Sequence, residues 1–284
     1  MTESLRQLDA TDHSRDSAGL RYVYPVVSRR AGGVSIGINL NPNNACNWRC
    51  IYCQVPNLTK GAAPVIDLGL LEKELRGMVG NVLRGDFLAQ RVPEDSRRVA
   101  DFAISGNGEP TSAKELADAI ERICDVKRHF GLGTEIPLRL ITNGSLVGRA
   151  YVQRALAALD RCGGEVWFKV DAGTADGIAR INGVTLKPAQ VIRNLRRCAE
   201  ICPTWVQTCV FLLDGAGPSD AEISAYLDLL EAVGIPSIRG VLLYGIARPS
   251  LQPEAPRLAR LSPASIEAVA EKIKTAGLTV RVSP

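Results

Sequence analysis

Short apolar runs with the character of strands alternate along this chain with longer amphipathic runs that have the period of helices. Six such strand–helix pairs follow one another, and one more short apolar run comes at the end. Apolar strands separated by helices are typical of a parallel sheet covered by its crossover helices. Right-handed crossovers wind such a sheet in one direction. Six units are too few to close an eight-stranded barrel, so the pattern predicts the α/β class and a partial (β/α)6 barrel.

The expected elements follow directly from these runs. Strands are expected over 34–40, 99–105, 138–142, 165–170, 205–213, 237–244 and 278–282. Helices are expected over 70–83, 113–130, 148–162, 188–201, 219–233 and 263–276. Residues 1–20 are polar and are expected to form a disordered leader. Residues 21–284 are expected to form a single domain, the partial barrel with a C-terminal helix and a short strand.

Composition removes several classes of protein. With 46% hydrophobic and 23% charged residues, the chain is expected to be globular rather than disordered. No apolar run reaches the ~20 residues of a membrane span, and the polar N-terminus is no export signal, so we expect a cytoplasmic protein. Its eight cysteines are then expected to be reduced. The chain has only two histidines, His13 and His129, and this small number argues against histidine acid–base catalysis. The net charge of +4 permits an anionic partner without requiring one.

Polar and small residues gather where the first four strands end. The segments there read NPNNACNWRCIYCQ, GNGEPT, NGS and DAG. In a parallel barrel the carboxyl ends of the strands meet at one mouth, where active sites lie. We therefore expect the functional residues in these four segments.

Cys46, Cys50 and Cys53 lie in the first of these segments with the spacing C-x3-C-x2-C. Three thiolates on one loop are soft ligands that favour an iron–sulfur cluster or zinc. Three protein ligands leave one coordination position open, as in a catalytic site. The alternatives are a zinc site and three unrelated buried cysteines.

The segment Cys46-Asn-Trp-Arg-Cys50-Ile-Tyr52-Cys53 resembles the C-x3-C-x-aromatic-C signature of the radical S-adenosylmethionine (radical SAM) superfamily. The resemblance implies a partial barrel of that type, with a [4Fe–4S] cluster on the three cysteines and S-adenosylmethionine on the fourth iron. It further implies an external one-electron donor of the flavodoxin or ferredoxin type. Cofactor cleavage would then give a 5′-deoxyadenosyl radical that removes a hydrogen atom from the substrate. Tyr52, the aromatic residue of the signature, is expected beside the cofactor.

The second and third segments fit cofactor-binding turns of the same family. Gly106 and Gly108 lie in a turn similar to its G-G-E-P motif, where close backbone approach binds the methionyl amine. Glu109 would hold that ammonium group by a charge-assisted hydrogen bond, or would be an acid at a helix N-terminus. Thr142 and Asn143 correspond to polar groups for the ribose. The alternative for Asn143 is a turn residue before a glycine.

Lys169 and Asp171 are separated by one residue in the fourth strand, so both side chains point into the barrel. They would hold the carboxylate and ribose of the cofactor, or form a structural buried pair. Lys169 is also the candidate catalytic residue. We favour a clamp on the cofactor over a Schiff base, because a lysine beside an aspartate stays charged.

Segments 26–40, 169–173 and 244–249 resemble a wyosine-synthase-like branch of the superfamily, related to tRNA 4-demethylwyosine synthase. Its members modify a guanosine in transfer RNA, using pyruvate and a catalytic lysine. Those enzymes build a second cluster from cysteines near the N-terminus. This chain has no cysteine before Cys46. The expected substrate is an RNA base or a nucleobase. The alternatives are a small metabolite or peptide, and a non-catalytic iron–sulfur electron carrier or zinc-binding module.

Other cysteines leave a second cluster open as an alternative. Cys198 and Cys202 share one helix face, and Cys162 and Cys209 would complete a set of four. The simpler interpretation is that they are small buried hydrophobic residues.

Overall fold

A computed structural model describes residue 8 and residues 18–28 and 32–283. The predicted disordered leader therefore lies mostly outside the described residues. Leu8 is buried, and its backbone N–H donates a hydrogen bond of 2.7 Å to the carbonyl of Arg91. This contact ties one point of the N-terminal segment to the end of a short helix, α2 (Phe87–Arg91).

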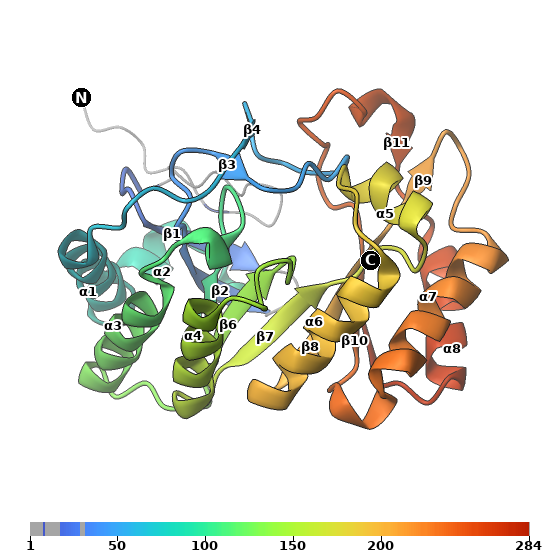
Figure 1. Cartoon of the computed structure of the whole chain (residues 1–284). Coiled ribbons are helices and arrows are strands. Elements are labelled where there is room, and N and C mark those ends of the chain that lie inside the picture. The colour runs from blue at the N-terminus through green and yellow to red at the C-terminus, as the bar shows by residue number, and fades with distance from the viewer. Residues whose placement is uncertain (1–7, 9–17, 29–31, 284) are drawn as a thin grey trace.

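One eight-stranded sheet organises the described chain, and its strand order follows the sequence (Figure 1). The strands are β1 (Val23–Ser28), β2 (Gly33–Ile38), β5 (Val99–Ile104), β6 (Leu138–Thr142), β7 (Glu165–Lys169), β8 (Thr204–Val210), β10 (Val241–Gly245) and β12 (Val280–Ser283). β1 and β2 are antiparallel, and all later neighbours are parallel. The sheet curls into a half-barrel whose edges are β1 and β12. This confirms the predicted α/β class and partial (β/α)6 barrel.

Helices cover the outer face of the sheet. The long ones are α1 (Leu68–Arg84), α3 (Leu116–His129), α4 (Ala150–Arg161), α6 (Pro188–Ile201), α7 (Asp220–Val233) and α8 (Pro263–Thr275), and the sequence predicted each of them. The sequence did not predict α5 (Ala175–Asn182), or the two-residue strands β3 (Ala45–Cys46), β4 (Thr59–Lys60) and β11 (Leu258–Ala259), and it joined β9 (Leu212–Leu213) to the strand before it. Among the described residues, no helix has the length and apolar character that crossing a membrane requires.

Alternate residues of the strands point to opposite faces of the sheet. On the outer side, Ile36, Phe102 and Leu140 are fully buried in the main hydrophobic core under the helices. On the inner side, Asp101 and Gln207 lie in the same sheet and line a cavity. Polar inner residues cannot fill a barrel as branched apolar residues do. The interior is therefore left hollow, and this hollow is the candidate site.

The edge strand β1 escaped prediction because Pro25 interrupts its apolar run, and proline in a run argues against a strand. At a sheet edge its missing N–H is tolerated, and Pro25 pairs with Ile36 of β2. A buried carboxylate in α1 fixes the start of this strand. Glu74 accepts hydrogen bonds from the backbone N–H groups of Arg21 (2.9 Å) and Tyr22 (2.8 Å).

Two predicted strands have different bounds. The run over 205–213 divides at residue 211, and its last part, β9, pairs with β11 instead of the main sheet. The run over 237–244 begins as a 3₁₀ turn (Ile235–Ser237), so β10 starts only at Val241. In both cases the predicted run extends beyond the part of the chain that pairs in the main sheet.

The prediction that all eight cysteines are reduced is wrong for one pair. Cys124 of α3 and Cys162, just after α4, form a disulfide with their Cα atoms 6.3 Å apart. Neighbouring helices bring together two residues that are 38 positions apart, which sequence spacing could not show. Cys162 is therefore unavailable for the second cluster considered above.

Gly144 provides a test of this packing. It has a φ of +69°, and a Cβ there would lie 2.0 Å from the ring of Phe168. Gly131 has a similar φ of +70° but nothing within 4 Å of a Cβ. We expect Gly131→Ala to destabilise the fold by about 1–2 kcal/mol through backbone strain alone. Gly144→Ala should lose about 1–3 kcal/mol more, because the ring must move. Urea denaturation measures both free energies of unfolding, and equal losses would contradict the predicted clash.

Candidate active site

A cavity of about 290 Å³ occupies the hollow inside the curled sheet. It is lined by inner residues of the strands and by the segments that follow them. Seven of the residues selected from the sequence line it, namely Tyr52, Cys53, Gly106, Gly108, Thr142, Asn143 and Lys169. Cys46, Cys50 and Glu109 do not line this cavity, and Asp171 lines a second cavity instead.

The cysteine loop, residues 41–61, crosses the mouth of the half-barrel from β2 to α5 (Figure 1). Backbone N–H groups of Arg49 and Ile51 donate to the carbonyls of Asn182 (3.1 Å) and Ile181 (2.9 Å) at the end of α5. The hydroxyl of Ser250 donates to the carbonyl of Ile51 at 2.7 Å. Segments more than 100 residues apart thus hold the loop in place.

Nitrogen donors point at two of the three thiols. The N–H of Trp48 lies 3.5 Å from Cys46 Sγ, and Asn182 Nδ2 lies 3.4 Å from Cys50 Sγ. Burial raises the pKa of Cys46 and of Cys50 to about 12, so without a cation these groups are neutral thiols. The described residues contain no set of three ligand side chains already arranged around a metal position. Three free thiols on one loop nevertheless match the soft ligands of an iron–sulfur cluster.

Gly106 and Gly108 allow two loops to come close together. A Cβ on Gly108 would lie 1.9 Å from the carbonyl oxygen of Ala45, and one on Gly106 would lie 2.2 Å from Asn39 Oδ1. The turn after β5 therefore packs directly on the cysteine loop. Glycine is required here for contact within the chain, and both glycines also line the cavity.

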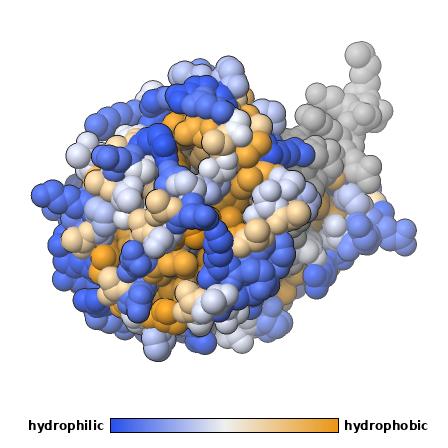
Figure 2. Space-filling model, turned by 90° about the vertical axis from the view of Figure 1, so that its right-hand side faces the viewer, coloured by the Kyte–Doolittle hydropathy of each residue, from blue (hydrophilic) through white to orange (hydrophobic). Residues whose placement is uncertain are grey.

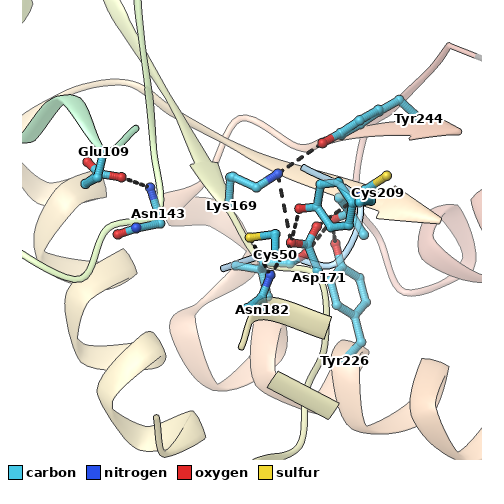
Figure 3. A network of polar contacts seen from close by, with 12 residues as sticks. Cys50, Glu109, Asn143, Lys169, Asp171, Asn182, Cys209, Tyr226 and Tyr244 are labelled. Carbon is cyan, nitrogen blue, oxygen red and sulfur yellow. Dashed lines mark hydrogen bonds and ion pairs between the residues drawn. The ribbon is translucent and has the colours of Figure 1, made fainter. Parts of the chain in front are cut away.

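Glu109 is buried and caps the 3₁₀ helix Pro110–Ser112, so the helix N-terminal alternative describes its position. Its Oε1 accepts from the N–H of Thr111 (3.0 Å) and the hydroxyl of Thr142 (2.6 Å). Its Oε2 accepts from the N–H of Asn143 at 2.7 Å (Figure 3). Burial raises the pKa of Glu109 against the effect of these donors. Glu109 thus joins the turn after β5 to the turn after β6.

The side chain of Asn143 forms hydrogen bonds within its own turn and to the cysteine loop. Its Oδ1 accepts from the N–H of Ser145 at 3.0 Å, as expected of a turn residue before a glycine. Its Nδ2 donates to Asn47 Oδ1 at 2.8 Å. Asn47 lies between two of the cysteines, so this bond positions the loop that carries them.

Asp171 is the centre of the polar network in Figure 3, and its side chain is 0% exposed. It accepts hydrogen bonds from the Tyr52 hydroxyl (2.5 Å), Asn182 Nδ2 (2.8 Å) and the backbone N–H of Cys209 (3.0 Å). These donors belong to the cysteine loop, to α5 and to β8. One carboxylate therefore joins three parts of the chain.

Lys169 lies above this carboxylate, with its Nζ 3.9 Å from Asp171 Oδ2. It donates to the Tyr244 hydroxyl at 3.0 Å and lies 5.0 Å from the centre of the Tyr52 ring. Burial lowers the pKa of Lys169, but Asp171 raises it together with the nearby Tyr244, Cys50 and Cys209, and the combined result is a raised pKa. Lys169 is thus an ammonium at neutral pH, stabilised by one carboxylate and two aromatic faces.

Sequence reasoning missed several members of this network. Asn182 gave no signal because its helix was not predicted. Tyr244 lay in a segment noted for its resemblance to the wyosine-synthase-like branch, at the end of a predicted strand, and that position could have identified it. The backbone N–H of Cys209 could not be identified, because any residue type could supply it.

A second cavity of about 350 Å³ adjoins this site among the loops before α5 and α7, and Asp171 and Cys209 belong to its lining. Ile223, Val269 and Ile273 of α7 and α8 contribute apolar walls. Figure 2 views this side of the molecule, where hydrophobic residues lie in hollows between hydrophilic ones.

Residues 40–230 match the family described as the Radical SAM superfamily. The chain belongs to this superfamily. This match confirms the predicted resemblance to the superfamily. Iron–sulfur and S-adenosylmethionine binding are traits of the family as a whole.

Curated relatives share part of this chain. UPF0026 protein slr1464 of Synechocystis is 29% identical over 161 residues, which are 56% of this chain and 52% of that protein. UPF0026 protein MJ1312 of Methanocaldococcus jannaschii is 28% identical over 151 residues, 52% of this chain and 39% of that protein. A protein named GTPase Obg from Brachyspira hyodysenteriae is 29% identical over 155 residues, 54% of this chain and 19% of that protein. The chain thus spans about half or less of the relatives' lengths.

Solved structures share the fold. TYW1 with a lysine-pyruvate adduct bound has a TM-score of 0.55 and 17% identity, covering 85% of this chain and 73% of that chain. A radical SAM methyltransferase from Sphaerobacter thermophilus has a TM-score of 0.60 and 16% identity, covering 88% and 66%. The likeness to TYW1 confirms the predicted resemblance to the wyosine-synthase-like branch at the level of fold.

The Asp171 network predicts a large coupling in stability. Asp171→Ala should destabilise the protein by about 3–5 kcal/mol, because it leaves the Lys169 ammonium buried without its partner. The double variant Lys169→Met, Asp171→Ala should lose clearly less than the sum of the single losses. Asp214→Ala, which breaks an exposed pair with Arg257, is the control and should change stability far less. Additive losses in chemical denaturation would show that the two charges do not depend on each other.

Proposed function

We propose that this enzyme uses a [4Fe–4S] cluster and S-adenosylmethionine to remove a hydrogen atom from a nucleobase, either free or within RNA. One observation carries the proposal: three free thiols lie on a loop at the mouth of a cavity whose wall holds Lys169. A purely structural metal site would not need such a cavity. Residues 21–284 would act together as one domain, since strands of the sheet extend from Val23 to Ser283.

Cys46, Cys50 and Cys53 would hold the cluster through their sulfur atoms. When bound, the cluster and S-adenosylmethionine supply a 5′-deoxyadenosyl radical, for which an external donor of the flavodoxin or ferredoxin type provides one electron. The chain would bind and orient the cofactor and the substrate, and it would exclude water from them. The N–H groups that face the sulfur atoms of Cys46 and Cys50 would stabilise them as thiolates.

Other residues would position the cofactor. Lys169 would attract its carboxylate, because this ammonium lines the cavity and stays charged. Gly106 and Gly108 would present backbone to the methionyl amine, and Thr142 and Asn143 would face the ribose.

Two carboxylates selected from the sequence would act through their neighbours. The donors around Asp171 belong to the chain, so we assign it to positioning Tyr52 and Lys169. Glu109 would hold the turns that carry the cofactor contacts. Its Oε2 accepts one hydrogen bond from the chain, so this oxygen would be the one that can accept a further hydrogen bond.

A small metabolite or a peptide is the alternative substrate. Support for the nucleobase comes from the resemblance of residues 26–40, 169–173 and 244–249 to the wyosine-synthase-like branch, and the fold of TYW1 is similar over most of this chain. That likeness concerns the fold, so the substrate class is a proposal that ligand binding must decide.

Iron and sulfide analysis tests the cluster. After anaerobic reconstitution we expect about four iron atoms per wild-type chain. The triple variant Cys46→Ala, Cys50→Ala, Cys53→Ala should retain almost none. The double variant Cys198→Ala, Cys202→Ala is the matched control and should keep the full content. Full iron content in the triple variant would reject the assignment, and about eight iron atoms in the wild type would revive a second cluster.

Substitution of Lys169 distinguishes its role as a clamp on the cofactor from a role as a Schiff-base lysine. If it clamps the cofactor, Lys169→Met should weaken S-adenosylmethionine binding by about 2–5 kcal/mol, the range for losing a desolvated charge partner. Lys114→Met, an exposed substitution, is the control and should bind normally. Calorimetry on reconstituted protein measures both affinities.

Treatment of the wild type with borohydride and pyruvate tests the other role. A stable adduct on Lys169, found by peptide mass spectrometry, would mean that this residue forms a Schiff base. We expect no adduct, because the raised pKa keeps the amine protonated and a poor nucleophile.

A further inference from the structure

Two buried side-chain atoms among the described residues have no hydrogen-bond partner, Asp101 Oδ1 and Gln207 Nε2. Both residues are 2% exposed, and both line the cavity of the candidate active site. Native structures satisfy the great majority of buried polar atoms, so each exception needs an explanation. The second cavity has neither of these atoms in its lining.

The two residues come from separate strands of the curled sheet. Asp101 lies in β5 and Gln207 lies in β8, with β6 and β7 between them. Side chains on the inner face of a curled sheet converge, so both reach the same hollow. Gln207 is the register partner of Lys169, which places it beside the proposed cofactor clamp.

The carboxylate of Asp101 is held so that one oxygen stays available. Its Oδ2 forms an ion pair with Arg139, and Arg139 Nε also binds Glu165 Oε1 at 2.8 Å. The same guanidinium lies 4.7 Å from the centre of the Trp167 ring, and Trp167 lines the cavity. Arg139 is thus fixed by two carboxylates and a ring, and it orients Asp101 while leaving Oδ1 unpaired.

We propose that Asp101 and Gln207 form a substrate subsite for an uncharged group that carries an N–H donor and a carbonyl acceptor, as an amide or a lactam does. The N–H would donate to Asp101 Oδ1, and the carbonyl would accept from Gln207 Nε2. An anion would be repelled by Asp101, and a simple cation would offer nothing to the Gln207 donor. That this ligand is the substrate rests on the proposed function.

Two sources share this chemistry, the lactam edge of a nucleobase and the amide of a peptide or metabolite. Uridine and N-acetylglycinamide are the probes for them. Their counterparts 3-methyluridine and N-acetylsarcosine dimethylamide keep the carbonyl groups but lack the amide or lactam N–H. Calorimetry would use reconstituted enzyme with S-adenosylmethionine and no reductant, and also the cluster-free chain. We expect at least one probe to bind at least tenfold more tightly than its methylated counterpart. The probe that does so identifies the source.

Variants then assign the binding to these two residues. Gln207→Met and Asp101→Asn should each raise the Kd of that probe about tenfold or more. Gln207→Met should leave the melting temperature unchanged or raise it, because it removes a buried donor without a partner. Asp118→Asn, an exposed substitution on α3, is the control and should leave the Kd unchanged.

The subsite is rejected if neither N–H probe binds more tightly than its methylated counterpart, or if both variants bind as the wild type does. This outcome is distinguishable from failure of the proposed function. Enzyme that loads four iron atoms but does not discriminate the probes would reject only the subsite. A chain that loads no iron but discriminates them would reject only the cluster.

Discussion

The buried carboxylate of Asp171 is the interaction on which the arrangement of the site depends. It collects Tyr52 from the cysteine loop, Asn182 from α5 and a backbone N–H from β8, and it balances the charge of Lys169. A carboxylate without exposure is stable only when its oxygens are fully engaged. The cysteine loop, α5 and β8 must therefore all be in place before the charge of Asp171 can be buried.

The second constraint is the set of polar residues on the inner face of the sheet. Apolar residues on the outer face form the core under the helices, and this packing holds the curl. On the inner face Trp167, Trp205 and Leu242 pack together, and the remaining inner positions carry Lys169, Asp101 and Gln207. Their burial is unfavourable unless each finds a partner. Lys169 finds one in the chain, whereas Asp101 and Gln207 each keep one atom that a ligand can satisfy.

The three cysteines and the turns after the strands are linked through neighbouring groups. Glu109 bonds to Thr142 and Asn143, and Asn143 in turn bonds to Asn47 of the cysteine loop. A change at Glu109 would therefore reach the cysteine loop through one intermediate side chain. Glu109, Thr142 and Asn143 were selected from the sequence as cofactor ligands. Their hydrogen bonds also hold the turns and the cysteine loop in place.

The sequence by itself determined the layers of the fold and the chemistry of its loop. Hydrophobic period identifies helices such as α3 and α6, because packing on one face requires apolar residues at fixed intervals. The spacing of Cys46, Cys50 and Cys53 is likewise a local property, and the family match agrees with it. Strand β1 escaped because Pro25 is acceptable only at an edge, and edges are assigned by the finished sheet.

Tertiary structure alone decided which residues meet. The disulfide between Cys124 and Cys162, the contact of Asn182 with Cys50 and the position of Gln207 beside Lys169 join separate elements. Such contacts depend on the accumulated twist of many strands and on the crossovers between them, and no single segment encodes them. For the same reason the unpaired atoms of Asp101 and Gln207 became visible only in the folded chain, because a polar atom lacks a partner only once its neighbours are known.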